Sequence, residues 1–335
     1  MAIVEATDLR KVFRSVVRRP GLAGAVQALF SREFEEKIAV DSVTFRIEPG
    51  ELVGYLGPNG AGKSTTIKML TGILVPTSGR LEVAGLVPFE RRQDNAQNIG
   101  VVFGQRSQLY WDLPLRESFE LLRSIYDVPR DRYRTNLDHF VEILDLDDFM
   151  DTPVRQLSLG ERMRGDFAAA MLHDPKIVYL DEPTIGLDVV AKEAIREFIA
   201  SVNRDRGTTV ILTTHDLADV ERLSRRIILI DEGTVIYDGP LERLREEYGT
   251  HRTLVVTLLE SPAEIEVPGA EVESRELNVV RLRFNRRALT AEALIRRVTE
   301  RYQISDVAIT EPDIESIVRR IYLEGYHEGA VGAPS

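Results

Sequence analysis

A glycine-rich loop with one lysine carries the most specific chemistry in this sequence. Residues 57–65 read GPNGAGKST and fit the pattern G-x-x-x-x-G-K-[ST]. In that pattern the glycines let successive backbone N–H groups point at phosphate oxygens, and the following helix directs its positive N-terminus at the same anion. Lys63 would reach the β- and γ-phosphates of a nucleotide, and the Ser64 hydroxyl would bind Mg²⁺. The predicted nucleotide-binding residues are Gly57, Pro58, Asn59, Gly60, Ala61, Gly62, Lys63, Ser64 and Thr65.

A second segment supplies two carboxylates. Residues 177–182 read IVYLDE, four apolar residues followed by Asp181 and Glu182. An acid at the end of a buried strand commonly accompanies a phosphate-binding loop and holds the Mg²⁺ ion. We therefore expect Asp181 to be a metal ligand and Glu182 to orient and deprotonate the attacking water. Many strands end in acids, so this segment is informative because the loop accompanies it.

The elements around these two segments predict an α/β domain. Apolar runs typical of strands buried on both faces occupy residues 52–56, 177–180, 209–212 and 227–230. Helical stretches alternate with these runs, and one of them follows the glycine-rich loop directly. Strands that alternate with helices indicate a largely parallel sheet. The alternative interpretation of the loop, a glycine-rich turn with a surface lysine, would not need this flanking strand and helix.

Four other motifs narrow the class of protein. Gln105 follows a short strand-like segment, residues 157–161 read LSLGE, residues 186–188 read GLD, and His215 follows the run at 209–212. Residues 1–240 resemble the nucleotide-binding subunit of ABC transporters. These four motifs, the glycine-rich loop and the two carboxylates occur in the same order as six motifs of that subunit. These are the Walker A loop, Q-loop, signature loop, Walker B, D-loop and switch histidine. The resemblance implies a P-loop NTPase fold with a helical subdomain at about 106–172.

The resemblance also implies an assembly. ABC ATPase subunits bind ATP in a head-to-tail dimer, between the glycine-rich loop of one copy and the signature loop of the other. Ser158 and the backbone N–H of Gly160 would then contact the γ-phosphate in trans, and Asp188 of the D-loop would also bind the nucleotide. The family's LSGGQ reads LSLGE here, with Leu159 and Glu161 as the departures, so we expect an altered nucleotide affinity or dimer strength. A signature helix used only for packing is the alternative.

Three further residues take roles from the resemblance. Gln105 would touch Mg²⁺ or the attacking water and report the nucleotide state to the helical subdomain. His215 would contact the γ-phosphate and hold the water and Glu182 in place. Phe13 would stack on adenine through its ring. The alternatives are a structural histidine and a core or surface phenylalanine.

Composition restricts the partners. The charged residues sum to 43 − 54 = −11, and the chain has no cysteine. An acidic balance disfavours nucleic acid, because phosphate binding needs a basic surface. Without cysteine there are no disulfides, thiolate metal sites or cysteine nucleophiles. No apolar run reaches the ~20 residues that cross a bilayer, so we expect no membrane span in this sequence. The resemblance then implies a peripheral subunit at the cytoplasmic face of the cell membrane.

The expected partners follow from the resemblance. Integral membrane permease subunits would be encoded separately, and Tyr110 and Trp111 are candidate docking residues or, alternatively, packing residues of the helical subdomain. A homodimer is sufficient because both halves of the ATP site occur in one sequence, and a heterodimer is the alternative. Residues 10–32 carry six bases and no acid. This stretch belongs to a basic amphipathic insertion, about 14–37, that would face an anionic membrane surface, a permease or its own domain.

The C-terminal third predicts a second domain. Residues 250–325 alternate strand-like and helical patterns and indicate a small α+β module in which Thr290 caps a helix, and residues 326–335 are expected to form a flexible tail. The module resembles the C-terminal extension of ATPase subunits from drug- and lipid-type exporters. The function predicted from the whole sequence is ATP hydrolysis that powers export through permeases. The alternatives are the ATPase of an importer and a soluble ABC ATPase without a transport role.

Overall fold

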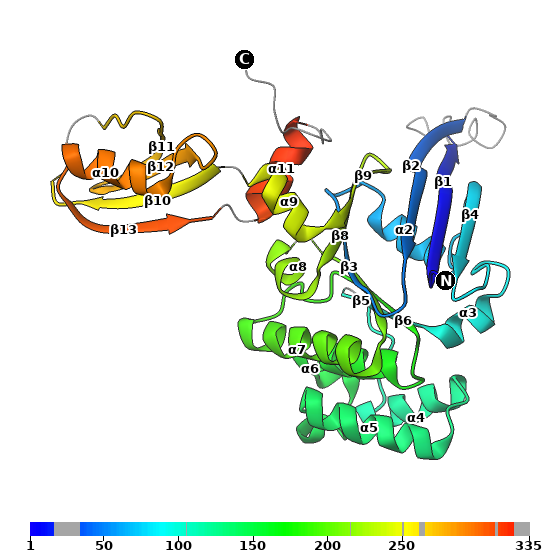
Figure 1. Ribbon diagram of the computed structural model, residues 1–335. Coiled ribbons are helices and arrows are strands. Elements are labelled where there is room, and N and C mark those ends of the chain that lie inside the picture. The colour runs from blue at the N-terminus through cyan, green and yellow to red at the C-terminus, as the bar shows by residue number, and fades with distance from the viewer. Residues whose placement is uncertain are drawn as a thin grey trace, which may run out of the picture. The chain divides into compact units, whose positions relative to one another are not determined.

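The chain divides into two compact units, Met1–Asp238 and Gly239–Ser335 (Figure 1). The computed structural model describes residues 1–16, 34–104, 106–214, 216–249, 251–260, 265–311 and 314–324. Among these residues, no helix combines the length and the apolar character that spanning a membrane requires.

The first unit contains a six-stranded sheet of order β5-β6-β7-β3-β8-β9. Its strands are β3 (Leu52–Leu56), β5 (Ile99–Phe103), β6 (Ile177–Asp181), β7 (Thr209–Thr213), β8 (Arg226–Asp231) and β9 (Thr234–Pro240). The pairs from β5 through β8 are parallel, so the strands that carry Leu56, Asp181 and Thr213 end at one edge. The apolar runs are buried, as parallel strands between helices must be. The predicted α/β fold is confirmed.

A three-stranded antiparallel sheet of order β2-β1-β4 completes the layers. Its strands are β1 (Val4–Val16), β2 (Phe34–Ile47) and β4 (Ser78–Val83). In the β1–β2 pair, Phe13 lies opposite Lys37 and Arg14 opposite Glu36. The described ends of the insertion expected at about 14–37, residues 14–16 and 34–37, continue this hairpin as strand. Residues 17–33, which hold its amphipathic half, lie outside the described residues.

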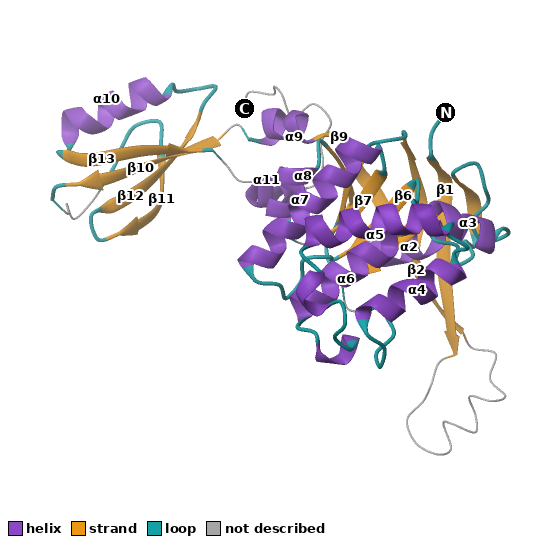
Figure 2. Ribbon diagram, turned by 90° about the horizontal axis from the view of Figure 1, so that it is seen from below, coloured by secondary structure: helices purple, strands orange, loops and turns teal. Residues whose placement is uncertain are grey.

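Helices cover the six-stranded sheet from both sides (Figure 2). They include α2 (Lys63–Leu70), α3 (Arg92–Asn98), α7 (Val189–Arg206) and α8 (Leu217–Leu223). Alternate residues of β6 enter different apolar cores, as the period of a strand requires. Tyr179 packs in the core that contains α2 and the antiparallel sheet, and Leu180 packs in the core that contains α7.

Three helices form the helical region at the lower end of Figure 1. They are α4 (Leu115–Ile125), α5 (Arg130–Leu144) and α6 (Leu159–Met171). Phe140 of α5 and Phe167 of α6 each meet Phe198 of α7 edge-on, with ring centroids 5.7 Å apart. All three rings are almost fully buried. This aromatic contact holds α6, which begins at the signature loop, against the core of the first unit.

Asp166 of α6 is a buried carboxylate that holds the segment just beyond position 105. Its Oδ1 accepts hydrogen bonds from Ser107 Oγ at 3.0 Å and from the backbone N of Gln108 at 2.9 Å. The side-chain amide of Gln108 donates to the backbone O of Asp166 at 3.0 Å. Burial raises the pKa of Asp166 to about 6, although these hydrogen bonds oppose the shift.

The second unit contains a four-stranded antiparallel sheet of order β11-β12-β10-β13. Its elements are α9 (Leu241–Tyr248), β10 (His251–Leu258), β11 (Glu271–Glu276), β12 (Val279–Asn285), α10 (Ala291–Arg301), β13 (Ile304–Thr310) and α11 (Ile314–Glu324). Helix α10 packs its buried Leu294 and Val298 onto one face of the sheet (Figure 2). Thr290 caps α10 as predicted, since its Oγ1 accepts from the N of Ala293 at 3.2 Å. The expected tail, 326–335, lies outside the described residues.

Replacing Asp166 with asparagine should stabilise the protein above about pH 6. The folded carboxyl has a pKa of about 6 against an ordinary value of 3.8, so the native state binds the extra proton and stability falls as the pH rises through this interval. Asparagine keeps an acceptor for Ser107 and Gln108 and does not ionise. At pH 8 we expect a gain on the order of 1–2 kcal/mol, measured by calorimetry, with exposed Asp148→Asn as the control. A lower unfolding midpoint for Asp166→Asn than for the parent at pH 8 would contradict this.

Candidate functional site

The glycine-rich loop connects β3 to α2, and two of its positions require glycine. Gly62 precedes α2 with a φ of 105°, in the left-handed region that side chains disfavour. A Cβ there would lie 2.4 Å from the carbonyl O of Ala39, and one at Gly57 would lie 2.5 Å from the O of Ile230. Any side chain at either position would displace backbone. The sequence therefore forms a tight loop whose backbone donors and helix N-terminus face one cavity.

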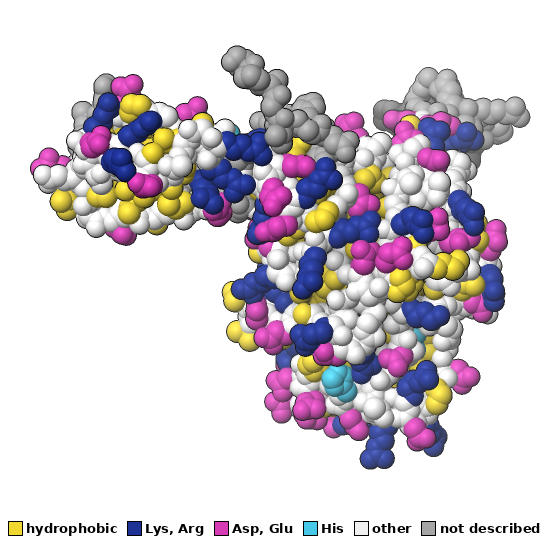
Figure 3. All heavy atoms as spheres, in the orientation of Figure 1, with side chains coloured by type: hydrophobic (Ala, Val, Ile, Leu, Met, Phe, Trp, Pro, Cys, Tyr) yellow, Lys and Arg dark blue, Asp and Glu magenta, His cyan; other side chains and the backbone are white. Residues whose placement is uncertain are grey.

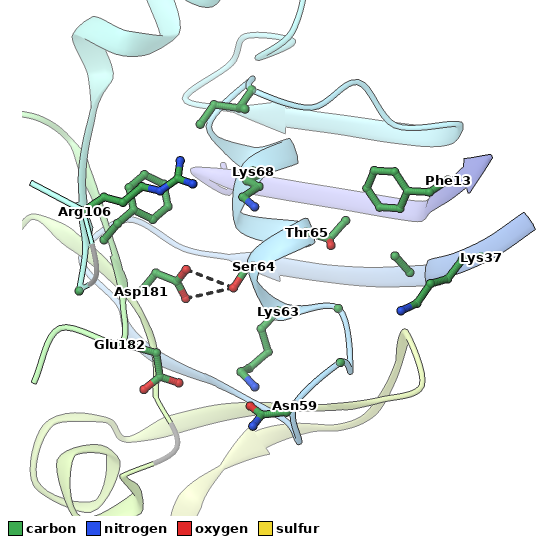
Figure 4. Close-up of a pocket in the computed structure, with 16 residues that line it drawn as sticks. Phe13, Lys37, Asn59, Lys63, Ser64, Thr65, Lys68, Arg106, Asp181 and Glu182 are labelled. Atoms are coloured by element: carbon green, nitrogen blue, oxygen red, sulfur yellow. Dashed lines mark hydrogen bonds between the residues drawn. The ribbon is translucent and has the colours of Figure 1, made fainter. Parts of the chain in front are cut away.

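Lys63 is the first residue of α2, and its side chain lies against this loop. Its Nζ donates to the carbonyl O of Gly57 at 2.5 Å and to that of Pro58 at 3.1 Å. Burial lowers the pKa of the Lys63 amine, while the carboxylates of Glu182 and Asp181 oppose the shift. Figure 4 shows Lys63 between the loop and the two acids. This arrangement keeps a cation beside the backbone donors of the loop.

Ser64 and Asp181 form a group of oxygen donors at the end of β6. Ser64 Oγ donates to Asp181, 3.1 Å from Oδ2 and 3.4 Å from Oδ1 (Figure 4). Thr213 Oγ1 donates to Asp181 Oδ1 at 2.5 Å. Mg²⁺ accepts such ligands, because it typically binds one or two carboxylates and completes its shell with water and substrate phosphates. The described residues contain no group of three or more histidine and acidic side chains that could hold a metal ion unaided.

Glu182 has a left-handed backbone, with a φ of 54°. Successive side chains of a strand point to opposite faces, and this turn instead lets both Asp181 and Glu182 line the same cavity. Its backbone is fixed from two sides: the N of Glu182 donates to Thr213 O at 2.9 Å, and a Cβ at Gly104 would lie only 2.0 Å from Glu182 O. The strain at this residue therefore delivers a second carboxylate to the cavity.

The cavity has a volume of about 630 Å³, within the range of ~300–1,000 Å³ for small-molecule sites. Phe13 of β1 lies at the opposite end from Asp181 (Figure 4). The Phe13 side chain is 40% exposed, and Lys11 Nζ lies 5.3 Å from its ring centroid. The cavity is lined by Phe13, Lys37, Ala39, Asn59, Gly60, Gly62, Lys63, Ser64, Thr65, Lys68, Ile73, Phe103, Gly104, Arg106, Asp181 and Glu182.

The other predicted contact residues gather at a second cavity of about 500 Å³. Ser158 and Gly160 lie at the start of α6, and Asp188 is the N-cap of α7, with its carboxylate accepting from the N of Ala191 at 2.9 Å. Ser158 and Glu161 form a reciprocal cap: Ser158 N donates to Glu161 Oε2 at 2.8 Å, and Glu161 N donates to Ser158 Oγ at 3.3 Å. Glutamine could make a similar cap, but glutamate adds a negative charge.

The structure thus brings the predicted residues together in two sets within one chain. The glycine-rich loop, Asp181, Glu182 and Phe13 share one cavity, and the signature loop and Asp188 share the other. The predicted residues Gln105 and His215 lie outside the described residues.

Sequence reasoning missed four basic or hydroxyl residues beside the first set. Lys37, Lys68 and Arg106 line the cavity, and Thr213 binds Asp181. Arg106 follows Gln105, and Thr213 stands two residues before His215, so proximity to the motifs was an available signal for both. Lys37 reaches the cavity only because the hairpin sets it opposite Phe13, which no local pattern indicates.

Comparisons with known proteins agree with this geometry. The model of the ABC transporter family matches residues 40–185. The chain is 34% identical over 296 residues to the daunorubicin resistance ATP-binding protein DrrA3 of Streptomyces coeruleorubidus, covering 85% of this chain and 92% of that one. It is 36% identical over 215 residues to the Nod factor export ATP-binding protein I of Burkholderia pseudomallei (strain 1710b), covering 64% and 70%.

A solved structure shows the same fold. The dimeric post-hydrolysis state of an ATP-binding cassette bound to ADP and Pi superposes with a TM-score of 0.59 at 27% identity, covering 71% of this chain and 98% of that one. The resemblance that the six motifs indicated is confirmed. The chain belongs to the ATP-binding proteins of ABC transporters and is an ATPase of that family.

Proposed function

We propose that this ATPase works as a head-to-tail dimer that powers export through separately encoded membrane permeases. The dimer is proposed from one observation: the two halves of the expected ATP site lie in separate cavities of one chain. The cavity with Lys63 and Asp181 has no residue of the signature loop, and the cavity with Ser158 has no residue of the glycine-rich loop. A second copy, turned head to tail, would supply each cavity with the part it lacks. Two identical copies suffice, and a heterodimer with a related subunit is the alternative.

In the proposed complex ATP occupies the first cavity. Loop N–H groups from Gly57 to Thr65 and the N-terminus of α2 bind the phosphates, and Lys63 exchanges its two carbonyl contacts for phosphate oxygens. Phe13 stacks on adenine with its exposed face. Ser64, Asp181 and Gln105 would hold Mg²⁺, which would neutralise phosphate charge.

Glu182 is the proposed general base. Its carboxylate lines the phosphate end of the cavity with Asp181, where it would accept a proton from a water molecule as that water attacks the γ-phosphorus. The bond between the γ-phosphorus and its bridging oxygen breaks, and ADP leaves with the electron pair, giving ADP and phosphate. His215 and Gln105 would position this water, in keeping with the motifs that they match.

The signature loop of the second copy would close the site from the other side. Ser158 Oγ and the Gly160 N–H would donate to the γ-phosphate, aided by the N-terminus of α6. The carboxylate of Glu161 would oppose this anion, but it is turned back onto Ser158 N at 2.8 Å. We therefore propose that the LSLGE sequence weakens closure relative to a loop with glutamine, without removing the phosphate contact.

Coupling to permeases is proposed from an exposed aromatic pair. Trp111 is 54% exposed and Tyr110 is 40% exposed, just beyond position 105, and large aromatic side chains are typical anchors of interfaces. Arg162 of α6 lies 5.8 Å from the Trp111 ring centroid. A permease helix on Trp111 would therefore contact both the segment after Gln105 and the signature helix. The subunit would then be peripheral, at the cytoplasmic face of the membrane.

Two observations favour export over import: the names of the relatives and the share of this chain that their alignments cover. One relative is named for Nod factor export and another for daunorubicin resistance. The alignment with the second of these covers 85% of this chain, so it includes part of the second unit. An importer ATPase and a soluble ABC ATPase are the alternatives. The acidic balance of the chain argues against nucleic acid as the partner. The basic stretch at 10–32 supports an added contact with an anionic membrane.

Lys63→Ala should abolish nucleotide binding with little loss of stability. The substitution removes the lysine that donates to the loop carbonyls and leaves the backbone donors without this cation. Titration with a fluorescent ATP analogue should show at least a hundredfold weaker binding. Lys176→Ala, which removes an exposed lysine elsewhere, is the matched control. Unchanged affinity in Lys63→Ala would exclude the first cavity as the ATP site.

Glu182→Gln should retain ATP binding but lose steady-state hydrolysis. The amide occupies the same space and cannot accept the proton of the attacking water. Phosphate release should fall by at least ~10²-fold, the lower range for a missing general base, while the affinity for ATP stays within a few-fold. Exposed Glu90→Gln is the control. Turnover like that of the parent protein would remove Glu182 from the mechanism.

Trp111→Ala should uncouple the ATPase from its permeases. The side chain is exposed in the isolated chain, so basal ATPase activity should persist while co-purification with the permeases from membranes falls. Leu277→Ala is the control: it truncates an exposed apolar side chain of the second unit and should change neither property. Normal co-purification of Trp111→Ala would rule out this docking residue.

A further inference from the structure

The two edges of the sheet in the second unit differ in how they are protected. On β11, four of six residues are charged, and the pairing register shifts between Val272 and Ser274. Charges and bulges are the usual means by which proteins prevent strands from adding to a sheet edge. On β13, which reads ISDVAIT, only Asp306 is charged. In the described part of the chain, no strand pairs with the outer side of β13.

An apolar row of this sheet runs out to the β13 edge and remains exposed there. Val256 lies opposite Val307, and Leu254 lies opposite Ile309. Opposed residues of antiparallel strands share a face, so Val307 and Ile309 lie on the face that α10 covers. Val256 and Leu254 are buried, but Val307 is 36% exposed and Ile309 is 42% exposed. The core of the second unit therefore continues to an uncovered edge (Figure 3 shows hydrophobic side chains along the lower margin of this unit).

The backbone of β13 has donors that point outward in a regular pattern. The N–H of Val307 donates to Asp306 Oδ1 at 2.8 Å, so it is not engaged with β10. Outward-pointing groups of a strand alternate with inward-pointing ones. The odd-numbered residues, including Val307 and Ile309, therefore present N–H and C=O groups at the free edge, and a paired strand would replace the Asp306 contact with a backbone acceptor.

We infer that β13 is a self-association edge, at which the second units of two copies of this chain pair their β13 strands in antiparallel fashion about Ala308. In this register Val307 of each copy lies opposite Ile309 of the other, which joins the two exposed ends of the apolar cores. Asp306 faces Thr310, so no like charges are opposed. Ala308, a small residue, meets its own copy at the close, non-hydrogen-bonded position on the two-fold axis. The result is one eight-stranded sheet.

This inference rests on the proposed dimer for its strength. Five residue pairs at an exposed edge form a weak interface alone. When the ATPase units hold two copies together, the second units meet at a raised effective concentration, so a weak contact becomes populated. The second unit would then add to the contacts that hold two subunits together while ATP is bound.

The absence of cysteine from the chain gives a direct test. In the proposed register the two Ala308 Cα atoms lie about 4.5 Å apart, a separation that a disulfide spans. Ala308→Cys in the full-length protein, under mild oxidation, should give a disulfide-linked dimer on a non-reducing gel. Ser274→Cys, at the protected edge, is the matched control and should give several-fold less. Both cysteine variants are also made in the Glu182→Gln protein and oxidised in the presence of ATP. In parallel, sedimentation of the Glu182→Gln protein without cysteine shows whether ATP produces a dimer.

Two edge variants separate specific pairing from chance collision. Val307→Lys should suppress the Ala308→Cys cross-link, because a lysine blunts the edge, whereas Val272→Lys at the other edge should not. Little or no cross-link at Ala308, or equal cross-linking at Ser274, overturns the inference even if ATP produces a dimer in sedimentation. If the Ala308 cross-link forms but ATP produces no dimer, edge pairing stands and the head-to-tail dimer of the proposed function fails. If neither the Ala308 cross-link nor the dimer with ATP forms, both the edge pairing and the head-to-tail dimer are wrong.

Discussion

The candidate nucleotide site depends on the hydrogen bonds of one carboxylate, that of Asp181. It accepts hydrogen bonds from Ser64 at the start of α2 and from Thr213 at the end of β7, so one side chain joins three elements that are far apart in sequence. The contact exists because β3, β6 and β7 are parallel neighbours that end at the same edge of the sheet. Parallel strands that are buried on both faces must be apolar along their length. Their polar side chains therefore lie at the ends of the strands. The same edge therefore carries the loop, the proposed metal ligands and the candidate base.

The rest of the first unit fixes what this edge faces. Glycine at 57 and 62 lets the loop pass against Ile230 and Ala39, and the left-handed backbone of Glu182 brings a second acid into the cavity. On the other side of the unit, the aromatic contact of Phe167 with Phe198 holds α6, and Asp166 ties the segment after Gln105 to the same helix. A movement of the signature helix would therefore displace Ser107 and Gln108. This connection is a physical route between the proposed nucleotide contacts and the proposed permease contact.

Much of the fold and the site could be predicted from the sequence, for a physical reason. The loop, the Asp181–Glu182 pair and the buried strands are local patterns, and a parallel sheet leaves few places where their ends can meet. Local sequence patterns did not predict the features that depend on how strands pair with one another. Strand β11 is mostly charged and forms because it pairs with β12. Lys37 reaches the cavity only through its register with Phe13. The strained backbone of Glu182 and the buried bonds of Asp166 likewise arise from tertiary packing, which a single sequence does not report.

If each working site combines residues from two copies, mixing two inactive variants should restore activity. Lys63→Ala disables the glycine-rich loop, and Ser158→Glu sets a negative charge where the γ-phosphate would bind, so each variant alone should have lost ATPase activity. In a mixed dimer, one site contains both defects and the other contains neither. Mixing the two inactive proteins should therefore restore part of the parent rate of phosphate release. A mixture that stays inactive while both variants remain folded, or full activity in Ser158→Glu alone, would contradict the two-copy site.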